Sequence, residues 1–126
     1  MVITDNWRTP KWLMNIFGSW FDPCPSNPTF DGLKIEWESH TYVNPPYSNP
    51  LPWVKKAIDE NEKGKTVVML LRVDCSTKWY KLLMEQHPHI AFFNERIKFE
   101  TEEGEANSPP FCSMLVILEV KNERIS

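Results

Sequence analysis

Glycine and basic charge are both scarce in this chain of 126 residues. Only 4 glycines accompany 11 prolines, which predicts stiff turns and few flexible loops. The formal net charge of −3 excludes a uniformly basic surface, so any contact with phosphate groups must come from a local basic cluster. Four lysines form either such a cluster or the solvated face of a helix: Lys55, Lys56, Lys63 and Lys65.

Long apolar runs and sorting signals are also missing. The longest apolar run, residues 111–120, is interrupted by Ser113 and Glu119 and is too short to cross a bilayer. The sequence shows no signal peptide, so we expect a cytoplasmic protein without membrane contact.

Metal-ligand spacings are absent from the sequence as well. The 3 cysteines lie far apart, show no CxxC pattern and do not pair evenly, which favours reduced thiols. His87 and His89 flank Pro88 without a cysteine or acidic partner at ligand spacing, which is typical of loop residues. We therefore expect no metal site.

Apolar periodicity predicts three helices. The first begins after Thr9-Pro10, an N-cap followed by proline at the first helical position, and Gly18 can close it. Its buried face is expected to carry four apolar residues at helical spacing: Trp12, Leu13, Ile16 and Phe17. A second helix follows Asn49-Pro50 and ends near Gly64, and the third begins after a cap at Ser76.

Short apolar segments between these helices predict strands. They lie at residues 20–21, 40–43, 65–71, 90–93, 97–99 and 112–120. Because strands and helices alternate, we expect a three-layer α/β fold with a mixed, mainly parallel sheet and antiparallel pairs at one edge. No repeat or interdomain linker is visible, so residues 1–126 are expected to form a single domain.

The most informative segment is Asn44-Pro45-Pro46-Tyr47, which directly follows the predicted strand 40–43. Two adjacent prolines exclude the middle of a helix and donate no hydrogen bond to a sheet, so the segment is expected to be a rigid loop. Loops at the carboxyl ends of strands are where open α/β sheets bind ligands. The simplest alternative is a proline-rich turn without any chemical role.

This order of residues fits methylation of an amino group on a flat ring. The side-chain oxygen of Asn44 and the carbonyl of Pro45 can accept hydrogen bonds from the two N–H groups of the amine. Both acceptors would stabilise the positive charge that develops on the nitrogen during attack. Tyr47 offers an aromatic face for a base, worth about 1–3 kcal/mol per stacked base.

Motifs along most of the chain resemble the phage-type DNA adenine methyltransferases, a Dam-like family with small phage and prophage members. The Asn-Pro-Pro-Tyr element is shared by many amino-methyltransferases, whereas the Trp-x-Thr-Pro opening and the late Arg-x-x-Phe narrow the resemblance to this family. The matching segments begin, in family order, at Trp7, Phe21, Asp31, Val43, Trp53, Val68, Asp74, Arg96 and Ser108.

The resemblance implies a compact Rossmann-like methyltransferase fold, S-adenosylmethionine as the methyl donor, and adenine in DNA as the substrate. It places the protein in the cytoplasm of the host cell if a phage encodes it, and it requires neither a metal nor a covalent intermediate. The implied catalytic residues are Asn44, Pro45, Pro46 and Tyr47. The implied cofactor-binding residues are Trp7, Thr9, Pro10, Asp22, Pro23 and Cys24. The candidates for substrate contacts are Ser48, Arg72, Lys78 and Arg96.

Two departures from the family pattern keep other functions open. Residues 22–28 contain no glycine, although glycine is what permits close approach of a backbone to a ligand. Arg72 stands where the family usually has proline, and it either touches a phosphate or is a surface arginine. The alternatives are a catalytically degenerate fold that binds DNA or a protein, and a methyltransferase for another planar amine or amide. The short chain leaves little room for a target-recognition domain, so we expect either low sequence specificity or a homodimer.

Overall fold

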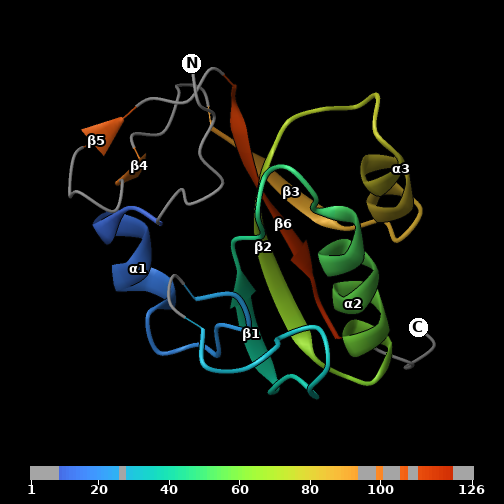
Figure 1. The fold of residues 1–126 in the computed structure, drawn as a ribbon. Helices are drawn as coiled ribbons and strands as arrows, with labels where there is room; N and C mark the ends of the chain where they lie inside the picture. Colours follow the sequence, from blue (N-terminus) through green and yellow to red (C-terminus); the bar gives the residue numbers. More distant parts are fainter. Residues whose placement is uncertain (1–8, 26–27, 94–98, 101–105, 108–110, 121–126) are drawn as a thin grey trace.

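The structure, a computed structural model, describes residues 9–25, 28–93, 99–100, 106–107 and 111–120 (Figure 1). Four strands form the main sheet, and the short strands β4 and β5 pair with each other in a second sheet. The elements in chain order are α1 Lys11–Phe17, β1 His40–Val43, α2 Leu51–Glu62, β2 Thr66–Arg72, α3 Lys78–Met84, β3 His89–Phe92, β4 Phe99–Glu100, β5 Ala106–Asn107 and β6 Ser113–Leu118.

The main sheet has the strand order β1-β2-β6-β3. Strands β1 and β2 are parallel, with Thr41 opposite Val67, and α2 connects them. Strand β6 lies between β2 and β3 and is antiparallel to both. It follows that β1, β2 and β3 all run in one direction and that β6 alone is reversed.

The prediction of a mainly parallel sheet is therefore wrong for the described strands, because β1 and β2 form the one parallel pair and the other two pairs are antiparallel. The cause is the interior position of β6. This strand carries apolar side chains on both faces, with Met114 and Val116 on one and Leu115 and Ile117 on the other. A strand of that kind buries more apolar surface inside a sheet than at its edge. The antiparallel pairs do lie at one edge, as expected.

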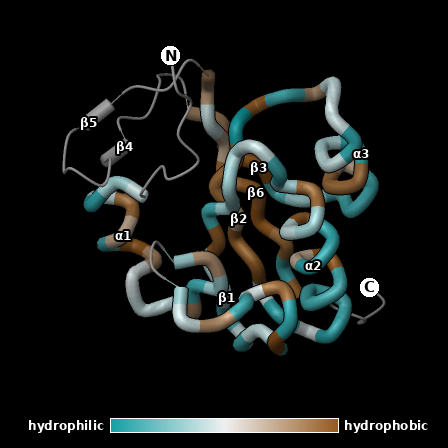
Figure 2. Tube along the Cα trace, in the orientation of Figure 1, coloured by the Kyte–Doolittle hydropathy of each residue, from teal (hydrophilic) through white to brown (hydrophobic). Residues whose placement is uncertain are grey.

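Side chains of β2 alternate between two apolar clusters, one on each face of the sheet. Val67, Met69 and Leu71 pack beneath α2 and α3, whereas Val68 and Leu70 face the side of α1. Figure 1 shows α1 on one side of the sheet and the other two helices on the opposite side. The hydrophobic colouring in Figure 2 is concentrated in the strands between these layers. The three layers expected from the sequence are therefore present.

Helices α2 and α3 occur close to their predicted positions. Val54 and Ala57 of α2 are buried against the sheet. The N-cap of α3 is Thr77 and not Ser76, because the Thr77 hydroxyl accepts the Tyr80 N–H at 3.3 Å while the Ser76 hydroxyl donates to Asp74. No helix in the described parts of the chain is long and apolar enough to cross a membrane.

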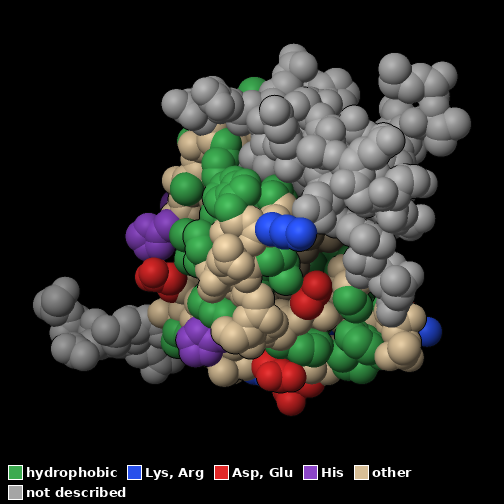
Figure 3. Space-filling view, turned by 90° about the vertical axis from the view of Figure 1, so that its left-hand side faces the viewer, with side chains coloured by type: hydrophobic (Ala, Val, Ile, Leu, Met, Phe, Trp, Pro, Cys, Tyr) green, Lys and Arg blue, Asp and Glu red, His purple; other side chains and the backbone are tan. Residues whose placement is uncertain are grey.

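Helix α1 also forms close to its predicted position, but its N-cap is Pro10 and not Thr9, and its buried face is narrower than expected. Leu13 is buried and Phe17 half-buried, whereas Trp12 is 50% and Ile16 is 60% exposed. Consecutive residues of a helix point about 100° apart. Leu13 and Phe17 therefore face the sheet, whereas Trp12 and Ile16, each one position earlier, face outward. Figure 3, viewed from the side of α1, shows hydrophobic side chains and few Lys or Arg among the described residues.

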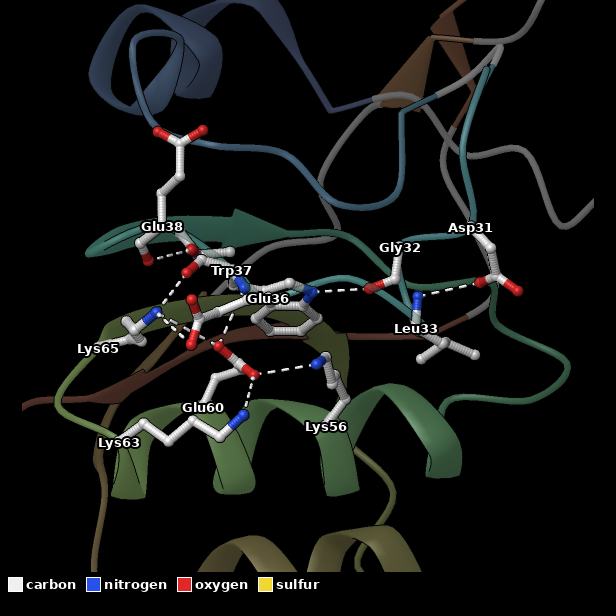
Figure 4. A network of polar contacts seen from close by, with 11 residues as sticks. Asp31, Gly32, Leu33, Glu36, Trp37, Glu38, Lys56, Glu60, Lys63 and Lys65 are labelled. Carbon is white, nitrogen blue, oxygen red and sulfur yellow. Dashed lines mark hydrogen bonds and ion pairs between the residues drawn. The ribbon is translucent and has the colours of Figure 1, made fainter.

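The amino end of the sheet contains a buried ionic network centred on Glu60 of α2 (Figure 4). The Glu60 carboxylate accepts from Lys56 Nζ at 2.9 Å and from Lys63 Nζ at 3.1 Å. Its other oxygen accepts the Trp37 N–H at 3.0 Å and lies 3.5 Å from Lys65 Nζ. Three of the four lysines that were candidates for a basic patch thus surround one carboxylate. They neutralise a buried charge in place of forming a free phosphate-binding surface.

Candidate active site

The candidate site lies where neighbouring parallel segments end. Phe21 forms an isolated parallel bridge with Thr41, and its N–H donates to the His40 carbonyl at 3.0 Å. This bridge continues the sheet beyond β1, so the ends of Phe21, β1 and β2 point to the same edge. Asp22, Asn44 and Asp74 follow these three segments. Ligands of open α/β sheets bind at such a carboxyl edge.

Asn44 is joined to the start of α1 by a chain of side-chain hydrogen bonds. Its Nδ2 donates to the Thr9 hydroxyl at 3.4 Å, and the same hydroxyl lies 3.2 Å from the phenol oxygen of Tyr42. Tyr42 and Asn44 share a face because side chains alternate along β1. A residue implied in cofactor binding and one implied in catalysis are therefore in direct contact.

The loop after Phe21 is folded around the Asp22 carboxylate. Asp22 Oδ1 accepts the Cys24 N–H at 2.9 Å. Burial raises the pKa of Asp22, although the Cys24 N–H partly offsets this. Burial, together with the Asp22 charge, raises the pKa of the Cys24 thiol to about 12. The thiol is therefore protonated at neutral pH, unlike the thiolate of an activated cysteine nucleophile.

A glycine does support this loop, but it comes from outside residues 22–28. A Cβ built on Gly32 would lie 1.8 Å from the carbonyl oxygen of Pro23, so only glycine fits against the loop. The Gly32 carbonyl in turn accepts the indole N–H of Trp37 at 2.7 Å. Gly32 therefore allows its own backbone to pack closely against the Pro23 carbonyl, although residues 22–28 contain no glycine.

The Asn-Pro-Pro-Tyr loop is enclosed on its tyrosine side. Pro45 and Tyr47 are buried, whereas Asn44 and Pro46 are half-buried. The Tyr47 ring meets Phe111 edge to face, with ring centroids 4.7 Å apart. Burial raises the pKa of the Tyr47 phenol above its ordinary range. Only 6% of Tyr47 is exposed, so stacking a base on its ring requires a movement of the ring or of its neighbours.

The remaining candidates differ in how closely they approach this loop. Arg72 Nη1 donates to the Tyr47 carbonyl at 2.6 Å. Ser48 and Lys78 are exposed, at the end of the loop and at the start of α3. Pro10 is the buried N-cap residue of α1. Trp7 and Arg96 lie outside the described residues.

Two residues of the site were not singled out in the sequence. Tyr42 connects Thr9 to the strand, and its position two residues before Asn44 was the available signal. Asp74 accepts from the Ser76 hydroxyl at 2.8 Å and pairs with Arg72 at 3.4 Å. Its spacing to Ser76 is typical of an Asx turn. The described residues contain no group of three or more metal-ligating side chains.

The carboxyl edge thus combines a loop that begins with an amide, Asn44, and a carboxylate, Asp22, that follows the neighbouring segment, in the place where α/β enzymes bind their ligands. Comparisons with known proteins specify the enzyme. A family model described as DNA N-6-adenine-methyltransferase (Dam) matches residues 26–126. The chain belongs to this family, as its motifs predicted, and is an adenine-specific DNA methyltransferase.

Two curated phage proteins show the same relationship. A DNA N-6-adenine-methyltransferase of Haemophilus phage HP1 is 37% identical over 93% of this chain and 80% of its own length. A protein of the same name from Escherichia phage T1 is 46% identical over 38% of this chain and 21% of its own length. No solved structure gives a significant match.

Proposed function

We propose that this protein transfers the methyl group of S-adenosylmethionine to the exocyclic amino group of adenine in DNA. The contact between Asn44 and Thr9 carries the proposal, because it joins the implied catalytic loop to the implied cofactor-binding segment. Family membership supports DNA adenine as the substrate. The donor and the residue roles are inferred from the chemistry of the site.

The residues at the carboxyl edge fit a cationic donor. S-adenosylmethionine supplies an electrophilic methyl group on a positively charged sulfur. The Asp22 carboxylate can complement that charge, and a bound cation would oppose the effect of burial on the pKa of Asp22. Thr9 and Pro10 on one side, with Pro23 and Cys24 on the other, would hold the donor against Asp22. The backbone of Gly32 packs against the Pro23 carbonyl on this second side.

Asn44 and Pro45 would act on the amine. The Asn44 side-chain oxygen and the Pro45 carbonyl accept hydrogen bonds from its two N–H groups, stabilise the charge that develops on nitrogen, and hold the amine in line with the methyl group. Pro46 stiffens the loop. The target base has to leave the helix to reach this site, as base-modifying enzymes require. Tyr47 would stack on the extruded base after its ring becomes accessible, and Ser48, Lys78 and Arg96 remain candidates for contacts with the DNA backbone.

The fold proposed for this chemistry is a compact Rossmann-like methyltransferase fold within a single domain, residues 1–126. Its support is the sequence β1-α2-β2-α3-β3, in which all three strands run in one direction, together with the reversed strand β6 between β2 and β3. A homodimer remains a prediction, which sedimentation of the protein with and without DNA would test.

The test is methyl transfer to unmethylated DNA. The full chain is incubated with S-adenosylmethionine and DNA, and the digested nucleosides are identified by mass spectrometry. N6-methyladenosine is expected from the unaltered protein and from Asn15→Ala, an exposed asparagine on α1, but not from Asn44→Ala.

The same experiment separates the alternatives. A methylated cytosine or a methylated protein amide would identify another planar amine or amide as the substrate. Absence of any product, together with absence of S-adenosylmethionine binding in calorimetry, would reject the proposal in favour of a degenerate fold that binds DNA or protein. The acidic net charge is the observation that favours this alternative.

A further inference from the structure

Arg72 connects three parts of the fold behind the Asn-Pro-Pro-Tyr loop. It is the last residue of β2, and its Nη1 donates to the Tyr47 carbonyl at 2.6 Å. Its Nε lies 3.4 Å from Asp74 Oδ2, in the loop that follows β2. Its guanidinium lies over the ring of Trp79 in α3, 5.3 Å from the ring centroid. The arginine thus fastens the loop after β1 to the loop after β2 and to α3.

These contacts use the particular geometry of arginine. The planar guanidinium donates in two directions at once and stacks on an aromatic ring, which a lysine ammonium does not do in the same way. A charged donor also makes a shorter and stronger hydrogen bond to a carbonyl than a neutral one. The carbonyl that it binds belongs to Tyr47, whose ring and phenol are buried. Tyr47, at the end of the loop, is therefore fixed both by the burial of its side chain and by the hydrogen bond to its backbone carbonyl.

We propose that Arg72 is a positioning residue, which keeps Asn44 and Pro45 in reactive geometry by holding the Tyr47 carbonyl, and that it does not bind DNA phosphate. The proposal rests on the proposed function of the loop. Displacing a reacting group by about 1 Å is enough to cost on the order of 100-fold in rate. A loop with two prolines transmits such a displacement, because its fixed φ angles leave few ways to absorb a shift at one end.

The first measurement is hydrogen exchange of the full-length protein over residues 47–51, read by mass spectrometry. Arg72→Ala is expected to accelerate exchange of this segment at least about tenfold, whereas Lys81→Ala, which removes an exposed charge from α3, leaves it unchanged. Arg72→Lys should give an intermediate exchange rate. The lysine ammonium keeps the positive charge but lacks the planar, forked arrangement of donors that arginine uses here. Unchanged exchange in both Arg72 variants would overturn the proposal. If Arg72→Ala does not fold, Arg72→Lys alone decides.

The second measurement separates positioning from phosphate binding. Methyl transfer by Arg72→Ala should show a kcat reduced by about 10- to 100-fold, with a KM for DNA within about twofold of the unaltered protein. The slope of log K for duplex DNA against log salt concentration should stay unchanged. A slope reduced by about 0.9 with kcat preserved would identify Arg72 as a phosphate contact and overturn the proposal. If the unaltered protein transfers no methyl group, the proposed function fails, and hydrogen exchange still tests the role of Arg72.

Discussion

The two ends of the main sheet are held together by different kinds of contact. At the amino end, the buried Glu60 carboxylate accepts hydrogen bonds of 2.9 Å from Lys56, 3.1 Å from Lys63 and 3.0 Å from the Trp37 N–H. At the carboxyl end, Arg72 holds the Tyr47 carbonyl at 2.6 Å, but the neutral side chains in front of it meet at longer distances: 3.4 Å from Asn44 to Thr9 and 3.2 Å from Thr9 to Tyr42.

The difference indicates a division of tasks. A buried carboxylate is stable only while it is saturated with donors, so the amino end resists rearrangement and contributes to folding. Long hydrogen bonds between neutral groups are weaker and exchange partners at low cost. The polar groups at the carboxyl end can therefore exchange these hydrogen bonds for contacts with a bound methyl donor and a base. Changes at one end should lower stability, and changes at the other end should lower activity.

The largest expected effect is at the carboxyl end. Asn44→Ala should lower kcat by about 10²- to 10³-fold, the usual cost of removing one preorganised acceptor or donor from a transition state. Its melting temperature should stay within about 2 °C of the unaltered protein, because the side chain is half-buried and its hydrogen bond to Thr9 is long, at 3.4 Å. Steady-state kinetics and thermal unfolding measure the two effects. Loss of S-adenosylmethionine affinity with kcat preserved would contradict the catalytic role of Asn44.

The opposite result is expected at the amino end. Glu60→Ala should lower the free energy of unfolding by roughly 2–3 kcal/mol, since removing one partner of a buried ionic network leaves its lysines less well compensated. Lys63 is partly exposed and remains hydrated, which limits the cost. Urea unfolding measures this loss. The kcat per folded molecule should be unchanged, and Glu62→Ala, an exposed neighbour, should have no effect on either quantity.

Gly32 lies behind the loop of Asp22 and should affect both quantities. Gly32→Ala should destabilise the protein by about 1–3 kcal/mol, because the new Cβ forces the Pro23 carbonyl to move. The displaced loop should also weaken S-adenosylmethionine binding, which calorimetry measures. Gly64→Ala provides a matched control with a different cause of strain, since Gly64 has open space around it but a φ of 101°. It should destabilise the protein without changing the affinity for the donor.

The last prediction concerns the pH dependence of stability at the amino end. Burial alone would raise the pKa of Glu60, but the hydrogen bonds from Lys56, the Trp37 N–H and Lys63 together lower it from the ordinary 4.5 to about 2. The folded form therefore binds this proton less readily than the unfolded form. The stabilisation is complete above the ordinary pKa and is lost as the pH falls from about 4.5 to about 2.

Urea unfolding from pH 6 to pH 2 would test this dependence. The Glu60→Gln variant should lack this part of the acid sensitivity. Asp74, whose pKa is also lowered by its hydrogen bond with Ser76, adds acid sensitivity of its own, so only the difference between the two proteins reports on Glu60. Equal pH dependence in both proteins would contradict the assignment.

The sequence predicted the position of the Asn-Pro-Pro-Tyr loop and most of the elements around it. Strand His40–Val43 and the helix after Pro50 occur where apolar periodicity and proline placed them, because both signals are local. The narrow buried face of α1 and the N-cap at Thr77 were not predicted. Spacing along one helix does not reveal how wide a surface its partner offers, and neighbouring Ser and Thr residues compete equally well for a cap.

The sequence by itself determined the local chemistry: a rigid Asn-Pro-Pro-Tyr loop after the strand at residues 40–43, a loop that begins with Asp22 after Phe21, and the motifs of the adenine methyltransferase family. Only the tertiary structure decided that β6 lies between β2 and β3 and that three lysines lie around the Glu60 carboxylate. It also decided that Gly32 packs against Pro23 and that Arg72 donates a hydrogen bond to the Tyr47 carbonyl. Apart from the Lys56 and Lys63 bonds to Glu60, which span three or four residues, these contacts join separate segments of the chain. Their partners are selected by which surfaces the packed sheet brings together, and residue patterns within one segment carry no information about that choice.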